Sequence, residues 1–211
     1  MNMSQEIAKK LLEIGAVDIR SMNDLFTWAS GIKSPIYCDN RLTMSYPEIR
    51  DMIAQGFESI IRENFSEAEV LVGTATAGIP HAAWVSQKMN LPMAYVRSSA
   101  KGHGKGNQIE GLIRKGQKVV VIEDLLSTGG SSMKAVDALK EAGADVLGVV
   151  AIFTYGFDQV DQLFDEKGIP YKTLTNYGVL LPIAVKMGYI KAEDKSILEK
   201  WSKDPYIFTK K

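Results

Sequence analysis

The segment at residues 119–132, VVVIEDLLSTGGSS, constrains the fold most, because an apolar β-branched run passes directly into acids, small hydroxyl residues and glycines. Residues 119–122 are typical of a strand buried on both faces of a parallel sheet. A helix is predicted to begin at about Ser131, so residues 127–130 would join the carboxyl end of the strand to the amino end of the helix. Unshielded backbone amides at such a junction bind anions, and a monophosphate would fit there.

Two adjacent acids, Glu123 and Asp124, follow the apolar run. Their carboxylates can accept hydrogen bonds from a vicinal diol such as that of a ribose, or face a divalent cation carried by a phosphorylated ligand. The alternative is an ordinary strand-to-helix turn, in which the acids are solvated and Ser131 or Ser132 only caps the helix. The chemistry of the residues alone leaves both interpretations open.

Strands and helices alternate after Pro47, which is expected to open a long helix. Strands are predicted at 70–73, 93–96, 118–122, 146–153 and 171–174, with helices at about 79–89 and 131–142. This alternation indicates an α/β fold with a mainly parallel central sheet flanked by helices. Ligands of such sheets bind outside the carboxyl ends of the strands.

The length of 211 residues and the hydrophobic content of 45% suit one domain. We expect amino-terminal elements at about 1–45, including a helix from Ser4 and a turn or hairpin. An α/β core would follow at about 46–175, and two helices separated near Gly188 at about 176–211. The whole chain, 1–211, would form a single folded unit.

Composition excludes several classes of protein. The 25 basic and 25 acidic residues cancel, which argues against nucleic-acid binding through a broad basic face. A single cysteine, Cys38, excludes an intrachain disulfide and a cysteine-based zinc cluster. No apolar run approaches the roughly 20 residues that span a bilayer, and the start lacks a signal-peptide core, so we expect a cytoplasmic protein without membrane contact.

Two further glycine-rich loops follow predicted strands. Residues 73–78, GTATAG, have no large side chain, so their backbone could approach a pyrophosphate, although a plain tight turn is the alternative. In residues 98–107, Lys101 and His103 alternate with glycines, which suits closure over a polyanionic leaving group or, alternatively, a solvated surface loop. His81, after Pro80, is expected to be structural.

These motifs resemble a known family. Residues 119–132 resemble the signature of type I phosphoribosyltransferases, and residues 73–78 resemble the pyrophosphate loop of those enzymes. The spacing of Arg97, Lys101 and His103 resembles the mobile catalytic loop of the orotate phosphoribosyltransferase family. The stretch SGIKSPIYCDNR, at 30–41, resembles the hood segment of that family. The motifs occur in family order over most of residues 20–155, which implies the type I phosphoribosyltransferase fold with a small amino-terminal hood.

The resemblance also implies an activity. The phosphoribosyl group would pass from phosphoribosyl pyrophosphate (PRPP) to N1 of orotate, giving orotidine 5-monophosphate and pyrophosphate in de novo pyrimidine synthesis. Mg²⁺ would be carried by PRPP, without a direct ligand from the protein. The enzyme would be a homodimer whose mobile loop closes over the neighbouring subunit's site, and the implied catalytic residues are Lys101, His103 and Asp124.

The resemblance assigns three sets of binding residues. PRPP would be held by Arg97, Lys101, His103, Glu123, Asp124, Leu125, Leu126, Ser127, Thr128, Gly129, Gly130 and Ser131. Orotate would contact Ser127, Tyr37, Cys38 and Tyr155. The pyrophosphate loop would comprise Thr74, Ala75, Thr76 and Ala77.

Four positions depart from the family pattern. Ala29 and Ala77 stand where many relatives have a lysine, and Ser98 stands where a second lysine is common. Tyr155 falls about where an arginine can contact orotate. Lys33 could supply the missing charge in the hood, or it could be a solvated lysine in a turn.

Three rival functions share part of the pattern. A purine phosphoribosyltransferase would share the PRPP loop but select its base through other hood residues. A PRPP-sensing regulator would keep that loop without catalysis, and Arg97, Lys101 and His103 argue against it, as does the absence of a basic face. A PRPP-synthesising kinase would need a longer chain and an ATP site.

Overall fold

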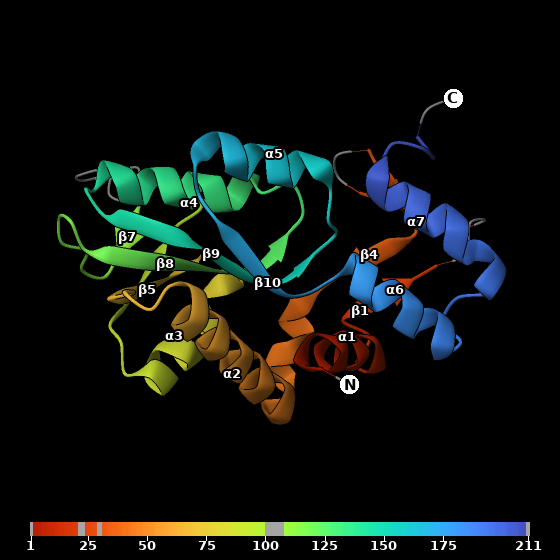
Figure 1. Ribbon diagram of the computed structural model, residues 1–211, viewed down its shortest axis with the longest axis horizontal. Coiled ribbons are helices and arrows are strands. Elements are labelled where there is room, and N and C mark those ends of the chain that lie inside the picture. Colours follow the sequence, from red (N-terminus) through yellow and green to blue (C-terminus); the bar gives the residue numbers. More distant parts are fainter. Residues whose placement is uncertain (1, 21–23, 29–30, 100–107, 210–211) are drawn as a thin grey trace.

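The computed structural model describes residues 2–20, 24–28, 31–99 and 108–209. A six-stranded sheet forms its centre (Figure 1). In spatial order, its strands are β10 (Tyr171–Asn176), β9 (Asp145–Thr154), β8 (Lys118–Leu126), β5 (Val70–Thr74), β6 (Met93–Val96) and β7 (Ile109–Glu110). All pairs are parallel except the last, in which the short edge strand β7 runs antiparallel to β6.

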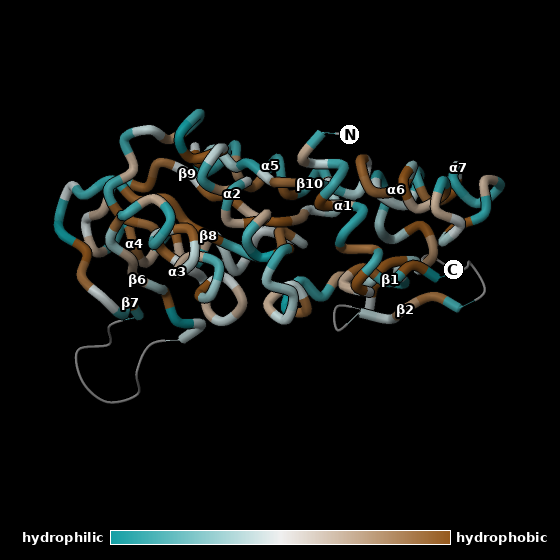
Figure 2. Tube along the Cα trace, turned by 90° about the horizontal axis from the view of Figure 1, so that it is seen from below, coloured by the Kyte–Doolittle hydropathy of each residue, from teal (hydrophilic) through white to brown (hydrophobic). Residues whose placement is uncertain are grey.

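Helices cover both faces of this sheet (Figure 1). Two of them, α2 (Pro47–Asn64) and α3 (Gly78–Met89), lie on one face; α4 (Gly130–Glu141) and α5 (Asp158–Lys167) lie on the other. Figure 2 shows hydrophobic segments along β8 and β9, and most residues of these two strands are buried. The predicted α/β class, with a mainly parallel sheet between helices, is therefore confirmed.

The sequence explains why these elements form the core. The first half of β8 consists of β-branched residues without exposed surface, as expected for a strand covered on both faces: Val119, Val120, Val121 and Ile122. In α2, buried apolar residues recur every fourth position, which turns one stripe of the helix toward the sheet: Ile49, Ile53, Phe57 and Ile61.

Two small sheets lie beside the core at the amino-terminal end of the chain. After α1 (Met3–Glu13), β1 (Val17–Ile19) pairs antiparallel with β4 (Ile36–Cys38), and β2 (Phe26–Thr27) pairs antiparallel with β3 (Lys33–Ser34). The 3₁₀ helix η1 (Asn40–Ser45) leads from β4 to α2. We call β1–β4 and η1 the hood. The predicted hairpin is thus present as β2 and β3.

The carboxyl-terminal elements lie next to the hood rather than over the sheet (Figure 1). They are α6 (Tyr177–Lys186), η2 (Ala192–Asp194) and α7 (Lys195–Lys203). Trp201 of α7 has no exposed surface, and its indole Nε1 donates a hydrogen bond to the Lys33 carbonyl oxygen at 3.2 Å. Among the described residues, no helix is long and apolar enough to cross a membrane.

The structure adds the short strands β1, β4 and β7, which were not predicted, and it differs from the sequence predictions in the length of β8 and in helix α5. β8 continues to Leu126, because its residues Leu125 and Leu126 pair with Phe153 and Thr154 of β9. The acids therefore lie on the strand and not in the loop after it. Helix α5 was not predicted, because only Val160 and Phe164 of its ten residues are buried, and two apolar residues give a weak helical pattern.

His81 is buried in α3, 1% exposed, with its ring against Phe57 and Trp84. Neither ring nitrogen has a hydrogen-bond partner among the described residues. Burial lowers the pKa of His81 from 6.5 to about 4. These observations support the expected structural role of His81, because a charged imidazolium would be poorly accommodated there.

The buried His81 should make stability depend on pH. Between pH 6.5 and pH 4 the unfolded chain binds a proton at this residue while the folded chain does not, so the free energy of unfolding falls as the pH falls. The integrated loss is roughly 3 kcal/mol. Urea unfolding at several pH values would measure it, and His81→Leu should remove this part of the dependence. If the other histidine variant, His103→Leu, removes it instead, the assignment to His81 is wrong.

Candidate active site

Three segments that are distant in the sequence enclose a cavity of about 340 Å³ at the carboxyl ends of β5 and β8. The hood contributes one wall, the loop between β5 and α3 a second, and the β8–α4 region the third. The lining residues are Cys38, Asp39, Arg41, Ala75, Thr76, Ala77, Glu123, Asp124, Leu125 and Ser131. Sequence analysis predicted a ligand site at this edge, and three of the segments that it named, 30–41, 73–78 and 119–132, supply lining residues.

Glu123 connects two of these segments. Its Oε1 atom accepts hydrogen bonds from Thr74 Oγ1 at 2.6 Å and from the backbone N–H of Asp124 at 3.1 Å. Its Oε2 atom accepts from Ser131 Oγ at 3.1 Å and from Ser132 Oγ at 2.9 Å. The side chain is buried, 5% exposed. Glu123 thus ties the end of β5 to the start of α4.

These contacts decide between the two interpretations of the strand-to-helix turn. A solvated acid is excluded for Glu123, because its carboxylate is buried and bound by three hydroxyl groups. Ser131 and Ser132 do not cap α4, because their hydroxyls donate to Glu123 and the N-cap residue is Gly129. The turn is therefore held by specific side-chain hydrogen bonds and is not an ordinary solvated turn.

The amino end of α4 is open to an anion. Gly129 caps the helix with a φ of +79°, and no side chain caps the first-turn amides. A Cβ atom at Gly129 would lie 3.0 Å from Phe164 and 3.2 Å from Leu163 of α5, so both the backbone conformation and the space require glycine. Uncapped amides and the helix dipole favour a phosphate group at this position.

The loop at 74–77 begins with Thr74, whose hydroxyl binds Glu123, and contains a cis peptide bond between Ala75 and Thr76. Helix α3 starts directly after it at Gly78. A Cβ atom at Gly78 would collide with the carbonyl oxygen of Ile122, so glycine lets the loop lie directly against β8. The loop therefore presents small side chains and backbone to the cavity.

Asp124 lines the same cavity as Glu123. Among the described residues no hydroxyl group binds its side chain, which instead forms a hydrogen bond with the carboxyl group of Glu123. Burial first, and then the charge of Glu123, raise the pKa of Asp124 to about 7. The Asp124 carbonyl oxygen accepts a hydrogen bond from Asn40 Nδ2 at 2.7 Å, and Asn40 is buried. Asn40 thereby fastens the hood to β8 beside the carboxyl group.

The predicted hood residues have different surroundings. Cys38 is buried and lines the cavity, and burial together with the charge of Asp124 raises the pKa of its thiol. Tyr37 is 45% exposed and lies against Phe26, with ring centroids 5.7 Å apart. Tyr155 is buried with its ring 4.9 Å from that of Trp28, so its side chain packs beneath the hood and does not line the cavity.

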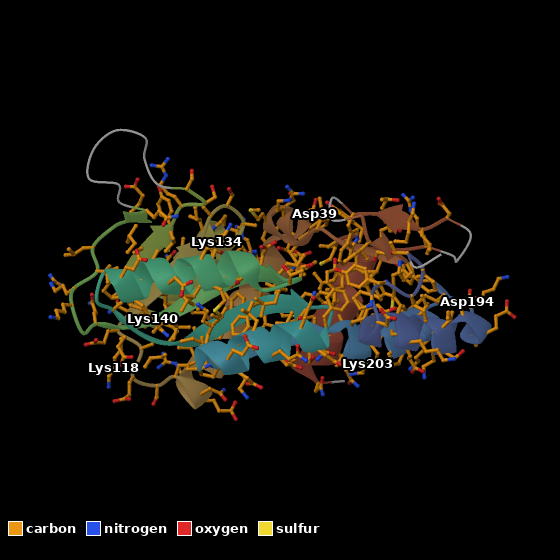
Figure 3. All side chains as sticks on the ribbon, turned by 90° about the horizontal axis from the view of Figure 1, so that it is seen from above. Asp39, Lys118, Lys134, Lys140, Asp194 and Lys203 are labelled. Atoms are coloured by element: carbon orange, nitrogen blue, oxygen red, sulfur yellow. The ribbon has the colours of Figure 1, made fainter. Side chains whose placement is uncertain are left out.

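A smaller cavity of about 180 Å³ adjoins the first and shares Ala75 and Ser131 with it. Arg97 and Ser98, at the end of β6, line this second cavity together with Lys134 of α4. In Figure 3, Lys134 lies on α4 and Asp39 lies on the hood, on the same side of the molecule. The structure therefore places Arg97 next to the main cavity but not in its wall.

Some predicted site residues lie outside the described part of the chain or outside the wall of the main cavity. Lys101, His103 and Ala29 lie outside the described residues. Leu126 is fully buried, so only its backbone could meet a ligand, and its carbonyl oxygen already accepts a hydrogen bond from Thr154. Ser127, Thr128, Gly129 and Gly130 form the junction before α4, beside the lining residues Leu125 and Ser131.

The side chain of Lys33 is used within the hood. Its Nζ atom donates a hydrogen bond to Thr27 Oγ1 at 2.7 Å, across the β2–β3 pair. Its backbone N–H donates to Thr209 Oγ1 at 3.0 Å. These contacts attach the hood hairpin to the carboxyl-terminal segment, and Lys33 does not line the cavity.

Sequence reasoning missed three residues of the site: Asp39, Asn40 and Arg41. They directly follow Cys38 in the hood motif, and three polar residues after a short apolar strand were the available signal. It also missed that Ser132 and Thr74 bind Glu123. Among the described residues, no group of three or more His, Cys, Asp or Glu side chains is placed to hold a metal ion.

Comparison with known proteins shows the family to which the chain belongs. A family model of the phosphoribosyl transferase domain matches residues 43–179. The chain is 58% identical to an orotate phosphoribosyltransferase of Listeria innocua over 210 residues, which is 100% of both chains. It is 59% identical to an orotate phosphoribosyltransferase of Staphylococcus haemolyticus over 199 residues, 94% of this chain and 98% of that one.

The fold is also similar to that of a solved orotate phosphoribosyltransferase structure. The crystal structure of orotate phosphoribosyltransferase from Aeropyrum pernix matches with a TM-score of 0.76 at 28% identity, over 87% of this chain and 99% of that chain. The sheet topology, the open phosphate junction and the family model together define a phosphoribosyltransferase. Sequence identity of 58% and 59% to two orotate phosphoribosyltransferases narrows this class to one family of enzymes. The chain belongs to the orotate phosphoribosyltransferase family.

Proposed function

We propose that this chain transfers the 5-phosphoribosyl group of PRPP to N1 of orotate, releasing pyrophosphate, as a step of de novo pyrimidine synthesis. One observation carries the proposal. A single cavity joins the Glu123–Asp124 pair and the start of α4 to a loop of small residues at 75–77. The start of α4 suits a phosphate group, the two acids suit the ribose hydroxyls, and the loop of small residues suits a pyrophosphate. Full-length identity to orotate phosphoribosyltransferases supports orotate as the base.

In the proposed reaction the anomeric C–O bond of PRPP breaks and a bond forms between that carbon and N1 of orotate. Positive charge develops on the ribose and negative charge on the departing pyrophosphate. Catalysis would be positional and electrostatic. Ionised Asp124 would accept hydrogen bonds from the ribose hydroxyls and favour the cationic sugar, while Glu123 would hold the two loops in register.

We propose the remaining contacts from the same geometry. The 5-phosphate would be bound by the amides and hydroxyls of Ser127, Thr128, Gly129, Gly130 and Ser131 at the start of α4. The pyrophosphate would lie on Thr74, Ala75, Thr76 and Ala77, next to Arg97. Orotate would lie under the hood against Ser127 and the backbone of Tyr37 and Cys38. Tyr155 would support the hood from below instead of contacting orotate.

Mg²⁺ would enter bound to PRPP and neutralise part of the pyrophosphate charge. Lys101 and His103 would stabilise the leaving group from a loop that closes over the neighbouring subunit's site in a homodimer. The low number of cations in the described wall of the main cavity supports a contribution from elsewhere. We further propose that the 211 residues form one domain that works in the cytoplasm, without nucleic-acid or membrane partners.

Loop sharing can be tested by complementation. Lys101→Ala and Asp124→Asn subunits, each nearly inactive alone, should regain activity when mixed and exchanged, because hybrid dimers contain one intact site. Light scattering would give the mass of each sample. Absence of regained activity in verified hybrid dimers would contradict a shared site.

The reaction itself is tested by following the loss of orotate absorbance with PRPP and Mg²⁺, using uracil, hypoxanthine and xanthine as parallel bases. Consumption of orotate alone is the expected result. Turnover of a purine would instead assign the chain to purine phosphoribosyl transfer. Binding of PRPP without turnover of any base would favour a PRPP sensor.

A further inference from the structure

The Asp, Glu, Lys and Arg residues among the described lining residues of the main cavity are Asp39, Arg41, Glu123 and Asp124. Three are acids, and Arg41 is the one cation among the described lining residues of this cavity. The facing loop at 75–77 carries no charge. A wall of this kind would repel a polyanion unless a cation faced it, so the position of Arg41 matters for any ligand that carries phosphate groups.

Asp39 holds the Arg41 guanidinium in a fixed orientation. Arg41 Nε donates to Asp39 Oδ1 at 2.6 Å, and Nη2 donates to Oδ2 at 2.9 Å. The backbone N–H of Arg41 also donates to Oδ1, at 3.2 Å, and Asp39 is the N-cap of η1. A bidentate pair of this kind fixes the plane of the guanidinium, and among the described residues no partner binds the two N–H groups of Nη1, which can bind another group.

The location of Arg41 suits a ligand better than a structural role. Its side chain is 61% exposed, while the side chain of Asp39 is 26% exposed. The hydrogen bonds and charge of Asp39 raise the pKa of Arg41, with smaller contributions from Tyr37 and Asp124, so the guanidinium stays charged. An exposed, oriented and charged fork at the mouth of a cavity matches the geometry of a phosphate group.

We propose that Arg41 is a substrate-binding residue that contacts the pyrophosphate group of PRPP, and that Asp39 is its positioning residue. The inference rests on the proposed function. Ala77 brings no positive charge to the cavity, and Arg41 would supply one. Arg41 and residues 75–77 belong to different segments and line the same cavity. The small side chains of 75–77 leave room between them for a pyrophosphate, whereas the orotate carboxylate would be nearer to Tyr37 and Cys38.

Arg62 provides a matched control for Arg41. Its side chain is also 61% exposed, and it pairs with Glu58, which is 22% exposed, at 3.0 Å on the outer turn of α2. Arg62 lines neither of the two cavities at the strand ends. The two arginines have equally exposed side chains, and each pairs with an acid. The test therefore compares Arg41→Ala and Arg41→Lys with Arg62→Ala.

The experiment measures KM for PRPP, KM for orotate, kcat, and inhibition by pyrophosphate for each variant, together with thermal unfolding to verify the fold. Arg41→Ala should weaken PRPP and pyrophosphate binding about tenfold or more, because a charged hydrogen bond is lost. KM for orotate should change little. Arg41→Lys should recover part of the loss, since it restores the charge without the fork. Arg62→Ala should match the unchanged protein.

Two results would overturn the proposal: unchanged pyrophosphate inhibition in Arg41→Ala, or a rise confined to KM for orotate, which would assign Arg41 to the orotate carboxylate. Calorimetric titration of Mg²⁺-pyrophosphate into the unchanged protein and Arg41→Ala keeps the test independent of turnover. If the protein fails to consume orotate but this titration still weakens about tenfold in the variant, the proposed function fails and the anion site stands.

Discussion

Glu123→Ala is expected to lower kcat/KM for phosphoribosyl transfer by about 10² to 10³. The substitution removes the acceptor of Thr74, Ser131 and Ser132 hydroxyls, so the loop after β5 and the start of α4 lose their common anchor. The pyrophosphate and phosphate sites would then no longer be held at a fixed separation. Steady-state kinetics with PRPP and orotate would measure the loss. Glu67→Ala, which removes an exposed acid paired with Lys118, is the control and should be nearly neutral.

The variant Glu123→Gln removes the negative charge of the side chain but keeps an oxygen that can accept hydrogen bonds. Glu123 contributes to raising the pKa of Asp124 to about 7, so activity that needs ionised Asp124 should fall as the pH drops through about 7. Removing the negative charge of Glu123 lowers the pKa of Asp124, so the acid limb of the kcat/KM profile should move to lower pH in Glu123→Gln. A limb that stays in place would show that Glu123 does not influence the titrating group.

Lys101→Ala is expected to reduce kcat by about 10² to 10³ while changing PRPP binding much less. Its proposed contact is with the leaving pyrophosphate, whose negative charge grows only as the C–O bond breaks, so the transition state loses more than the ground state. Rapid-mix and steady-state assays would separate the two effects. Lys115→Ala, in the turn that precedes β8 at the edge opposite the cavity, should keep full turnover. An unchanged kcat in Lys101→Ala would refute the leaving-group role.

Much of the fold follows from local patterns. The buried β-branched run of β8, the proline at the start of α2 and the glycine junction before α4 each have a signal within a few residues, and each element formed where predicted. α5 was missed because Val160 and Phe164 are its only buried residues. The length of β8 was underestimated because pairing with β9, a distant segment, extends it past the acids.

Within the site, the sequence identified segments but not partners. It predicted an orotate contact for Tyr155, which stays a prediction, but it gave no sign that the buried ring packs against Trp28. It did not find Asn40 and Arg41, because their roles depend on a cavity and on the backbone of Asp124, which lies 84 residues from Asn40. Such contacts leave no periodic or spacing signal in the chain.

By itself, the sequence determined the class of fold, the glycine-rich junction between strand and helix at 127–131 and the family resemblance, because strand period, helix starts and glycine positions are local properties. The tertiary structure alone decided how the two adjacent acids divide their roles. The buried carboxylate of Glu123 accepts a hydrogen bond from Thr74, 49 residues earlier in the chain, whereas the backbone of Asp124 is bound by Asn40 of the hood. Successive residues of a strand point to opposite faces, so neighbours with the same chemistry enter different environments that only packing specifies.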